Sequence, residues 1–128
     1  MIPADLRFAK THEWVRIQGD VARVGISDFA VKELTDLVYI DLPADGRAVQ
    51  VGDAFGEVES VKAVSDLYAP VAGTITAVNS ELPGNLQWLS EDPYGKGWIA
   101  EIQLSDPAQA QALMAADAYK KFCDSEQH

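Results

Sequence analysis

Hydrophobic and polar residues alternate over several short segments of the chain, which is the pattern of β-strands with one buried face. Turn-forming residues separate these segments, as at Gln18-Gly19-Asp20 and Pro43-Ala44-Asp45-Gly46. The predicted strands are Leu6–Ala9, Trp14–Ile17, Val21–Ile26, Asp36–Leu42, two strands of a hairpin within Phe55–Pro70, Thr74–Val78 and Trp98–Leu104. Many short strands with little helix predict a mainly β fold, either a sandwich or a flattened barrel.

Helical patterns occupy only two parts of the chain. Ser27 or Asp28 would cap a short helix over Phe29–Leu34. The 128 residues predict a single domain over 1–128, with its core at about residues 20–104. The segments 79–90 and 91–97 are predicted to be irregular.

A second helix is predicted over the C-terminal segment 106–122. Pro107 would occupy its first helical position, behind a cap from Ser105 or Asp106, because an amide proton is not needed there. Its packing stripe would be Ala110, Met114, Ala118 and Phe122. We interpret this stripe as core packing and not as a cofactor site.

The hairpin within Phe55–Pro70 has an unusual tip. Hairpin tips usually contain Gly, Asn, Asp or Pro, but here the tip Ser60–Ser65 surrounds Lys62 with small apolar residues. Such residues gain nothing from water, so one interpretation is that another molecule uses them. The other is that the turn is ordinary and the predicted boundaries are displaced. Periodicity alone leaves both open. Gly52 and Gly73 flank the hairpin almost symmetrically, which favours two similar halves joined at the lysine.

The charge of the chain restricts its partners. Ten basic and twenty acidic residues give a net charge of −10 and a pI near 4.4. Nucleic acids and anionic membrane surfaces would repel such a chain, and basic patches on other proteins would attract it. Between Glu33 and Asp66 there are eight acidic residues but only two basic ones, Arg47 and Lys62. A lysine on this acidic background is easy for a modifying enzyme to distinguish.

Several kinds of chemistry lack support in the sequence. There is no Gly-x-Ser-x-Gly elbow, no Cys/His pairing and no glycine-rich phosphate loop, so we expect no catalytic residue. The two histidines lack the spacing of paired metal ligands, and His12 is interpreted as structural. Cys123 is the only cysteine, which excludes an internal disulfide, suits a reducing compartment and fits a small residue on the last helix.

A family resemblance rests on the hairpin and on blocks elsewhere. Glu59-Ser60-Val61-Lys62-Ala63, followed by Ser65-Asp66 and Ala69-Pro70-Val71-Ala72-Gly73, resembles the lipoyl-attachment hairpin of the glycine cleavage system H proteins. Further similar blocks, in the expected order, are His12–Val15, Val24–Ala30, Leu42-Pro43, Asp92–Trp98 and Leu104–Pro107. The resemblance extends from about Ala4 to Phe122.

The resemblance implies a fold and a cofactor. The fold would be the barrel-sandwich hybrid of lipoyl and biotinyl domains, with two antiparallel sheets and extra terminal elements. Lipoate would be attached covalently to Lys62 as N6-lipoyl-lysine, and the modifying enzyme would read Glu59, Val61 and Ala63. Biotin carriers place Met on both sides of the lysine, which disfavours biotin here.

The resemblance also implies a role and partners. The carrier, itself not an enzyme, would accept an aminomethyl group from glycine at the pyridoxal-phosphate glycine decarboxylase (P-protein) and deliver it to the aminomethyltransferase (T-protein). The dihydrolipoyl dehydrogenase (L-protein) would reoxidise it, and a lipoyl or octanoyl transferase or a lipoate ligase would modify it. Met1–Leu6 shows no signal peptide or presequence pattern, so we expect the bacterial cytoplasm, or the mitochondrial matrix if a presequence has been removed.

A carrier of this kind needs a protected cleft for its cargo. The aminomethyl group carries a cationic amine and is unstable in water, so the cleft should present an anionic or accepting group. The candidates are Glu13 and Asp66, with the hydroxyl of Thr11 as a partner. Both carboxylates could instead be solvated surface charges or turn residues.

Two departures from the family pattern and two other functions remain open. Asn85–Ser90 lacks the expected Pro and Asn, in a loop that would line the cleft, and Phe29 replaces a frequent His or Tyr, which should affect packing. One alternative function is an H-like protein that relays lipoyl or octanoyl groups to 2-oxo acid dehydrogenases. The other is an interaction module that is never lipoylated.

Overall fold

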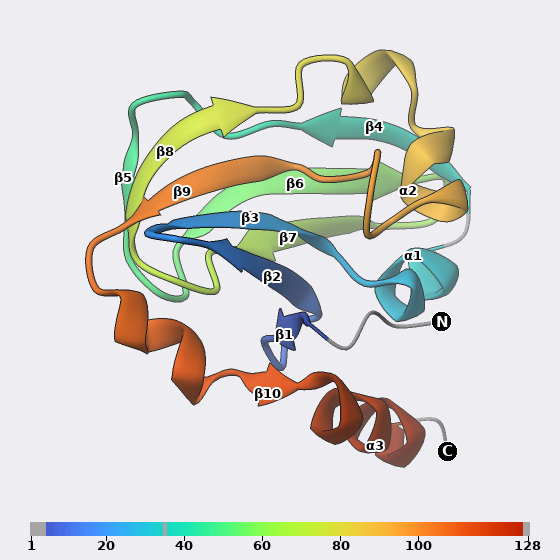
Figure 1. Ribbon diagram of the computed structural model, residues 1–128. Coiled ribbons are helices and arrows are strands. Elements are labelled where there is room, and N and C mark those ends of the chain that lie inside the picture. The colour runs from blue at the N-terminus through green and yellow to red at the C-terminus, as the bar shows by residue number, and fades with distance from the viewer. Residues whose placement is uncertain (1–4, 35, 127–128) are drawn as a thin grey trace.

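Two antiparallel sheets form the body of the protein (Figure 1). The computed structural model describes residues 5–34 and 36–126. One sheet has seven strands in the order β10-β1-β2-β3-β9-β8-β5, and the other has three in the order β4-β6-β7. Their bounds are β1 Arg7–Phe8, β2 Glu13–Gln18, β3 Val21–Ile26, β4 Leu37–Asp41, β5 Ala48–Val49, β6 Ala54–Ser60, β7 Val64–Tyr68, β8 Gly73–Val78, β9 Ala100–Leu104 and β10 Met114–Ala115. The mainly β, two-sheet prediction is confirmed.

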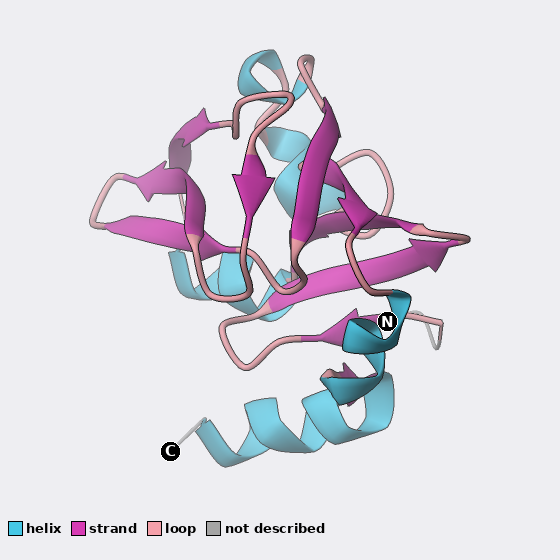
Figure 2. Ribbon diagram, turned by 90° about the vertical axis from the view of Figure 1, so that its left-hand side faces the viewer, coloured by secondary structure: helices cyan, strands magenta, loops and turns pink. Residues whose placement is uncertain are grey.

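Helices lie at the edges of this body. The α-helices are α1 Asp28–Leu34, α2 Gln87–Glu91 and α3 Ala116–Glu126, and two 3₁₀ helices are η1 Leu82–Gly84 and η2 Pro107–Ala112. Helices α1 and α2 lie at the same end of the sheets, while α3 runs outside the strands next to β10 and β1 (Figures 1 and 2). No helix in residues 5–34 or 36–126 is long and apolar enough to span a membrane.

The main core lies between the two sheets because alternate residues of each strand face inward. Strand β9 is an example, since Ala100, Ile102 and Leu104 are buried while the residues between them are only partly covered. From the other sheet, Val58 and Leu67 belong to the same cluster. Each fully buried Val, Leu or Ile contributes about 1.5–3 kcal/mol to stability.

A second cluster joins the two ends of the chain. Phe8 and Trp14 pack there with Tyr119 and Cys123 of α3, and all four side chains are buried. The buried Cys123 agrees with its interpretation as a small residue on the last helix. Trp14 needs the glycine at position 25, because a Cβ there would lie 2.6 Å from its indole ring.

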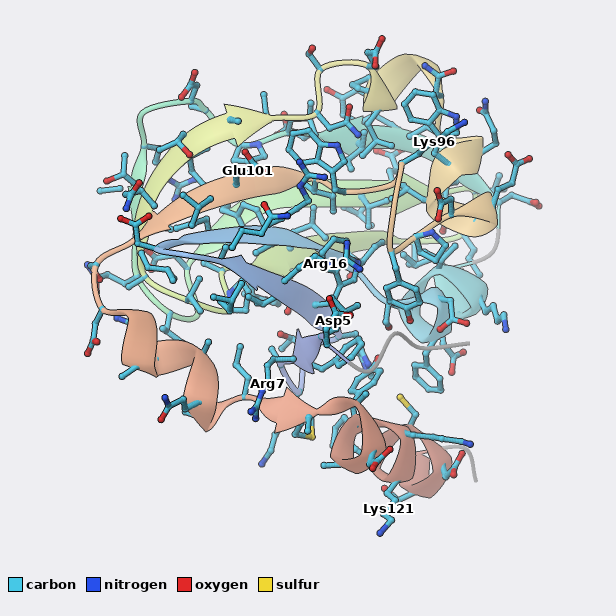
Figure 3. The ribbon with its side chains drawn as sticks, in the orientation of Figure 1. Asp5, Arg7, Arg16, Lys96, Glu101 and Lys121 are labelled. Atoms are coloured by element: carbon cyan, nitrogen blue, oxygen red, sulfur yellow. The ribbon has the colours of Figure 1, made fainter. Side chains whose placement is uncertain are left out.

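The N-terminal segment is also tied to a distant loop. The side chain of Arg16 on β2 donates to Asp5 at 3.2 Å and to the carbonyl of Tyr94 at 3.0 Å. Figure 3 shows Arg16 and Asp5 pointing toward one another at the outer surface of β2. The loop before β9 is therefore fixed against the first strands.

The prediction of one continuous C-terminal helix over 106–122 is wrong. The cap prediction holds, since Asp106 accepts the amide of Ala108 at 3.1 Å, but the first helix is 3₁₀ and ends at Ala112. Residues 114–115 then pair with β1, with Phe8 opposite Met114, before α3 begins. The backbone bonds of β10 interrupt the helix. Of the predicted stripe, Ala110 is buried and Met114 and Phe122 pack against the second cluster. Ala118 is exposed, and α3 buries Tyr119 and Cys123 instead.

The region between β8 and β9 is more ordered than predicted. It contains η1 and α2, the latter ending at Glu91, and the predicted strand from Trp98 begins only at Ala100. Asn79 holds the region together, because its side-chain amide donates to the carbonyls of Lys96 at 2.8 Å and Trp98 at 2.9 Å. Strand β5, of only two residues, was not predicted.

Candidate functional site

A tight reversal joins β6 to β7 at the lysine. Strand β6 ends at Ser60 and β7 begins at Val64, so residues 61–63 form the loop. Ser60 closes it, because its amide donates to the carbonyl of Ala63 at 2.8 Å and its hydroxyl oxygen accepts the amide of Ala63 at 3.1 Å. The buried side chain of Ser60 thus stabilises the turn, which glycine or asparagine at a hairpin tip more often does.

Lys62 stands exposed at this tip with apolar neighbours. The exposed fractions are 74% for Val61 and 57% for Val64, and Ala63 is exposed as well. The hairpin therefore reverses where the sequence placed it, which disfavours displaced boundaries, and the use of these apolar residues by another molecule stays a prediction. Glu59 is exposed on the outer face of β6, next to the tip. The three residues of the predicted recognition motif, Glu59, Val61 and Ala63, are all accessible to another protein.

Glu13 is buried at the junction of the two sheets. It begins β2, and its side chain is only 2% exposed. One carboxylate oxygen accepts the backbone amide of Tyr68 at 3.0 Å, and the other accepts the hydroxyl of Thr11. Tyr68 lies on β7, the edge strand of the three-stranded sheet. A carboxylate of one sheet therefore satisfies an edge amide of the other.

Burial makes the Glu13 carboxyl unusually easy to protonate. Desolvation raises its pKa from 4.5 to about 7, although the hydrogen bonds from Thr11 and Tyr68 favour the charged form and oppose the rise. Near neutral pH the group therefore exists in both protonated and charged forms. A carboxyl with such a pKa beside a surface hollow is a candidate functional group.

A hollow of about 250 Å³ lies between the hairpin and α1. It is lined by Thr11, His12, Phe29, Ala30, Glu33, Leu34 and Ser65. A second, mostly apolar hollow of about 340 Å³ lies on the other side of Thr11. It is lined by Ala9, Lys10, Thr11, Val51, Gly52, Tyr68, Ala69, Pro70 and Leu113. We call the first the arm hollow, because its Ser65 is only three residues from Lys62 and therefore at most about 11 Å away, whereas Tyr68 is six residues away.

The structure brings Thr11 and Glu13 together but places Asp66 elsewhere. Asp66 is exposed and lines a third hollow with Asp41, Arg47 and Glu57. Its carboxylate accepts a long hydrogen bond of 3.5 Å from the hydroxyl of Tyr68. Of the three predicted cleft residues, only Thr11 lines the arm hollow, and Glu13 lies one hydrogen bond behind it.

The two departures from the family pattern lie in the reverse of their expected positions relative to the arm hollow. Phe29, expected to affect packing alone, lines the arm hollow and lies with its ring centroid 5.0 Å from that of His12. Ser90, in the segment expected near the cleft, lines a separate polar hollow with Asp28 and Tyr94. Within the described parts of the chain, no three His, Cys, Asp or Glu side chains group closely enough to hold a metal ion.

Sequence reasoning missed a set of contacts around His12. The Nδ1 atom of His12 lies 2.7 Å from the hydroxyl of Tyr119, which in turn lies 2.5 Å from the hydroxyl of Ser27. His12 thus has the structural contacts expected of it, but it also lines the arm hollow. Tyr119 escaped notice because the predicted helical stripe selected other residues. Its signal would have been an aromatic residue three positions before Phe122 on the same helix.

Comparison with known proteins identifies the family. The family model for the glycine cleavage H-protein matches residues 6–126. The glycine cleavage system H protein of Mycobacterium avium is 52% identical over 124 residues, covering 93% of this chain and 94% of that protein. The protein of the same name from Carboxydothermus hydrogenoformans is 44% identical over 126 residues, with 98% and 97% coverage. The crystal structure of a glycine cleavage system H protein from Mycobacterium marinum superimposes with a TM-score of 0.85 at 37% identity, covering 99% of this chain and 100% of that one. The chain belongs to the glycine cleavage H-protein family.

Proposed function

We propose that this chain is the lipoyl carrier of a glycine cleavage system, with lipoate attached to Lys62. The observation that carries this proposal is the display of Lys62 at a closed hairpin tip between exposed apolar residues. Membership of the H-protein family supports the carrier role in glycine cleavage over a relay of lipoyl groups to 2-oxo acid dehydrogenases and over an unmodified interaction module.

The surroundings of Lys62 differ from those of other lysines. Lys32 pairs with Asp28 at 3.6 Å, and the ammonium group of Lys96 lies 5.9 Å from the Trp88 ring centroid. Lys62 has exposed apolar neighbours and the exposed acidic residue Glu59 on the adjoining strand. We propose that a lipoyl or octanoyl transferase, or a lipoate ligase, reads Glu59, Val61 and Ala63. Amide formation at Lys62 would change the net charge from −10 to −11.

The arm hollow is the proposed binding place of the lipoyl arm. An extended arm from the lysine Cα to the dithiolane spans about 14 Å at roughly 1.2 Å per bond, whereas Ser65, three residues along the chain, is at most about 11 Å from Lys62. When bound, the dithiolane supplies the redox and group-transfer chemistry, and the chain itself supplies none. The residues of the hollow would bind the end of the arm and exclude water from its cargo.

Thr11 and Glu13 would hold the amine of an aminomethyl cargo. The hydroxyl of Thr11 lines the hollow and can accept a hydrogen bond from the amine, while Glu13 supplies the negative charge behind it. In its protonated form Glu13 would lose this attraction, so its pKa near 7 makes the hold weaker in acid. Asp66, one residue beyond Ser65, is proposed only as a contact for the arm outside the hollow.

The proposed partners follow from the same role. Glycine decarboxylase would load the arm, the aminomethyltransferase would unload it and dihydrolipoyl dehydrogenase would reoxidise it. Tethering the cofactor to one lysine gives each active site a high effective concentration while the protein contacts stay weak. The acidic surface of the chain supports contact with basic patches on these enzymes.

Intact mass and peptide mapping test the attachment. After incubation with lipoate, ATP and a lipoate ligase, the chain should gain one lipoyl group, on Lys62. Lys62→Arg should abolish the gain and Lys96→Arg should retain it. A lipoyl group found on another lysine, or none at all, would refute the proposed site. Glycine–CO2 exchange with a P-protein then tests the function, because a lipoylated chain that supports no exchange would be left with the relay role.

A further inference from the structure

His12 has a backbone conformation that side chains rarely adopt. Its φ is 80°, the only positive φ at a non-glycine position among residues 5–34 and 36–126. The left-handed region is sparsely populated by residues with a Cβ, so surrounding contacts must maintain it. His12 lies directly between Thr11 and Glu13. Its conformation therefore determines how Thr11 faces the arm hollow and how Glu13 lies behind it.

The backbone contacts of His12 come from both sides of the segment. Its amide donates to the carbonyl of Ala9 at 3.0 Å, and its carbonyl accepts the amide of Ser27 at 2.9 Å. Its ring packs near Phe29 and Phe122, with centroid separations of 5.0 and 6.0 Å. These contacts hold the peptide, but the ring itself is oriented by a further hydrogen bond.

That hydrogen bond comes from the C-terminal helix. The hydroxyl of Tyr119 lies 2.7 Å from Nδ1 of His12 and 2.5 Å from the hydroxyl of Ser27. Tyr119 is fully buried, and its ring stacks on Phe8 with the centroids 4.1 Å apart and the planes 6° from parallel. Its hydroxyl is thus held firmly between two residues that lie far from it in the sequence.

Ser27 connects the same hydroxyl to the opposite wall of the arm hollow. The side chain of Ser27 accepts the amide of Ala30, and its carbonyl accepts the amide of Val31 at 3.1 Å, so Ser27 caps helix α1. That helix supplies Ala30, Glu33 and Leu34 to the hollow. One buried hydroxyl therefore contacts both the segment that carries Thr11 and the cap of the helix across the hollow.

We propose that Tyr119 is a positioning residue for the arm hollow, which makes the C-terminal helix part of the carrier site. Through His12 it fixes the segment Thr11–Glu13, and through Ser27 it fixes the start of α1. The value of this positioning to the cargo rests on the function proposed above. The proposed effect on Glu13 does not depend on that function, because the Tyr68 amide donates a hydrogen bond to Glu13 and its exchange can be measured in the unmodified chain.

Hydrogen exchange of the Tyr68 amide tests the positioning in the unmodified chain. Tyr119→Phe removes the hydroxyl and keeps the stacked ring. We expect the Tyr68 amide to exchange roughly tenfold faster, the size of effect that follows from losing one buried hydrogen-bond partner. Amides of β9 serve as the reference for global unfolding and should change less.

Tyr94→Phe is the matched control. Tyr94 belongs to the same aromatic cluster, and its hydroxyl also bonds near α1, to Asp28 at 2.9 Å. Neither its hydroxyl nor its ring has a described contact with His12, so the Tyr68 amide should keep the exchange rate of the parent chain. Equal rates in Tyr119→Phe and Tyr94→Phe, whether slow or fast, would overturn the proposal.

A second variant and a second readout complete the test. His12→Gly tolerates the left-handed region and has no side chain to bond Tyr119, so it should match Tyr119→Phe, and a parent-like rate would refute the proposal. In the lipoylated and loaded carrier, Tyr119→Phe should release its cargo several-fold faster than Tyr94→Phe. If neither Tyr119→Phe nor Glu13→Gln changes the rate of cargo release, the proposed cleft is refuted. The exchange rate of the Tyr68 amide still decides the role of Tyr119 in that case.

Discussion

The carboxylate of Glu13 accepts the backbone amide of Tyr68 at 3.0 Å, which joins the first long strand of one sheet to the edge strand of the other. Strand edges leave amides without partners, and burying such an amide unpaired is costly. Glu13 therefore has a structural task as well as its proposed role beneath the arm hollow.

Removing this acceptor should destabilise the fold. Glu13→Ala leaves the Tyr68 amide without its partner, at a cost of about 1–3 kcal/mol in the free energy of unfolding. Glu13→Gln keeps an acceptor oxygen and should cost less. Urea unfolding measures both, with the exposed Glu57→Ala, expected within about 0.5 kcal/mol of the parent chain, as the control. A Glu13→Ala chain as stable as the parent would contradict the assigned hydrogen bond.

The raised pKa of Glu13 predicts a pH dependence of stability. The folded pKa of about 7 lies above the unfolded value of 4.5, so unfolding releases a proton between these values. Stability linked to Glu13 is therefore fully present below pH 4.5 and is lost as pH rises toward 7, by up to roughly 3 kcal/mol. Unfolding free energies of the parent chain and of Glu13→Gln at pH 5 and pH 8 should diverge accordingly. A difference that stays the same at both values would show that Glu13 titrates normally.

Gly25 should tolerate no larger residue. A Cβ at this position would lie 2.6–2.7 Å from atoms of the buried Trp14 indole, whose nitrogen donates to the carbonyl of Pro93 at 2.9 Å. Gly25→Ala should therefore cost about 1–3 kcal/mol through overpacking. Gly84→Ala, where a Cβ would meet nothing within 4 Å, is the control. Thermal unfolding followed by tryptophan fluorescence measures both, and equal midpoints would contradict the packing described.

The apolar flanks of Lys62 should matter for modification but not for stability. Val61→Asp and Val64→Asp alter side chains that are 74% and 57% exposed, so the unfolding free energy should change by less than about 0.5 kcal/mol. Both should slow lipoate attachment several-fold, because a modifying enzyme would lose an apolar contact. The rate comes from a mass-spectrometric time course. Val51→Asp, 60% exposed but away from the tip, should retain the parent rate. An unchanged attachment rate in both tip variants would show that the modifying enzyme does not recognise Val61 or Val64.

Local patterns predicted the strands and the displayed lysine well. Alternation identified the hairpin, and the apolar residues around Lys62 marked its tip as unusual. The two-residue strands β5 and β10 were missed because two residues show no period. The broken C-terminal helix was missed for a related reason, since Met114 leaves the helix to pair with Phe8 near the other end of the chain.

The site was only partly visible in the sequence. Glu13 and Thr11 were named through the family resemblance, but the burial of Glu13 depends on a backbone amide of a distant strand. Tyr119 was not named, because its hydrogen bonds to His12 and Ser27 arise from tertiary packing alone. Asp66 was grouped with the other two on grounds of charge and sequence proximity to the lysine. Its position in another hollow reflects the direction of its side chain on an edge strand.

The serine-closed tip has a mechanical consequence. Within residues 61–63 no backbone angle lies in the left-handed region, and the loop contains no glycine. A further bond from the Val61 amide to the carbonyl of Asp36, at 3.0 Å, anchors it to the neighbouring segment. A group attached to Lys62 would therefore move by rotations of the lysine side chain, while the backbone of the tip stays fixed. Less conformational entropy is then lost when an enzyme binds the tip.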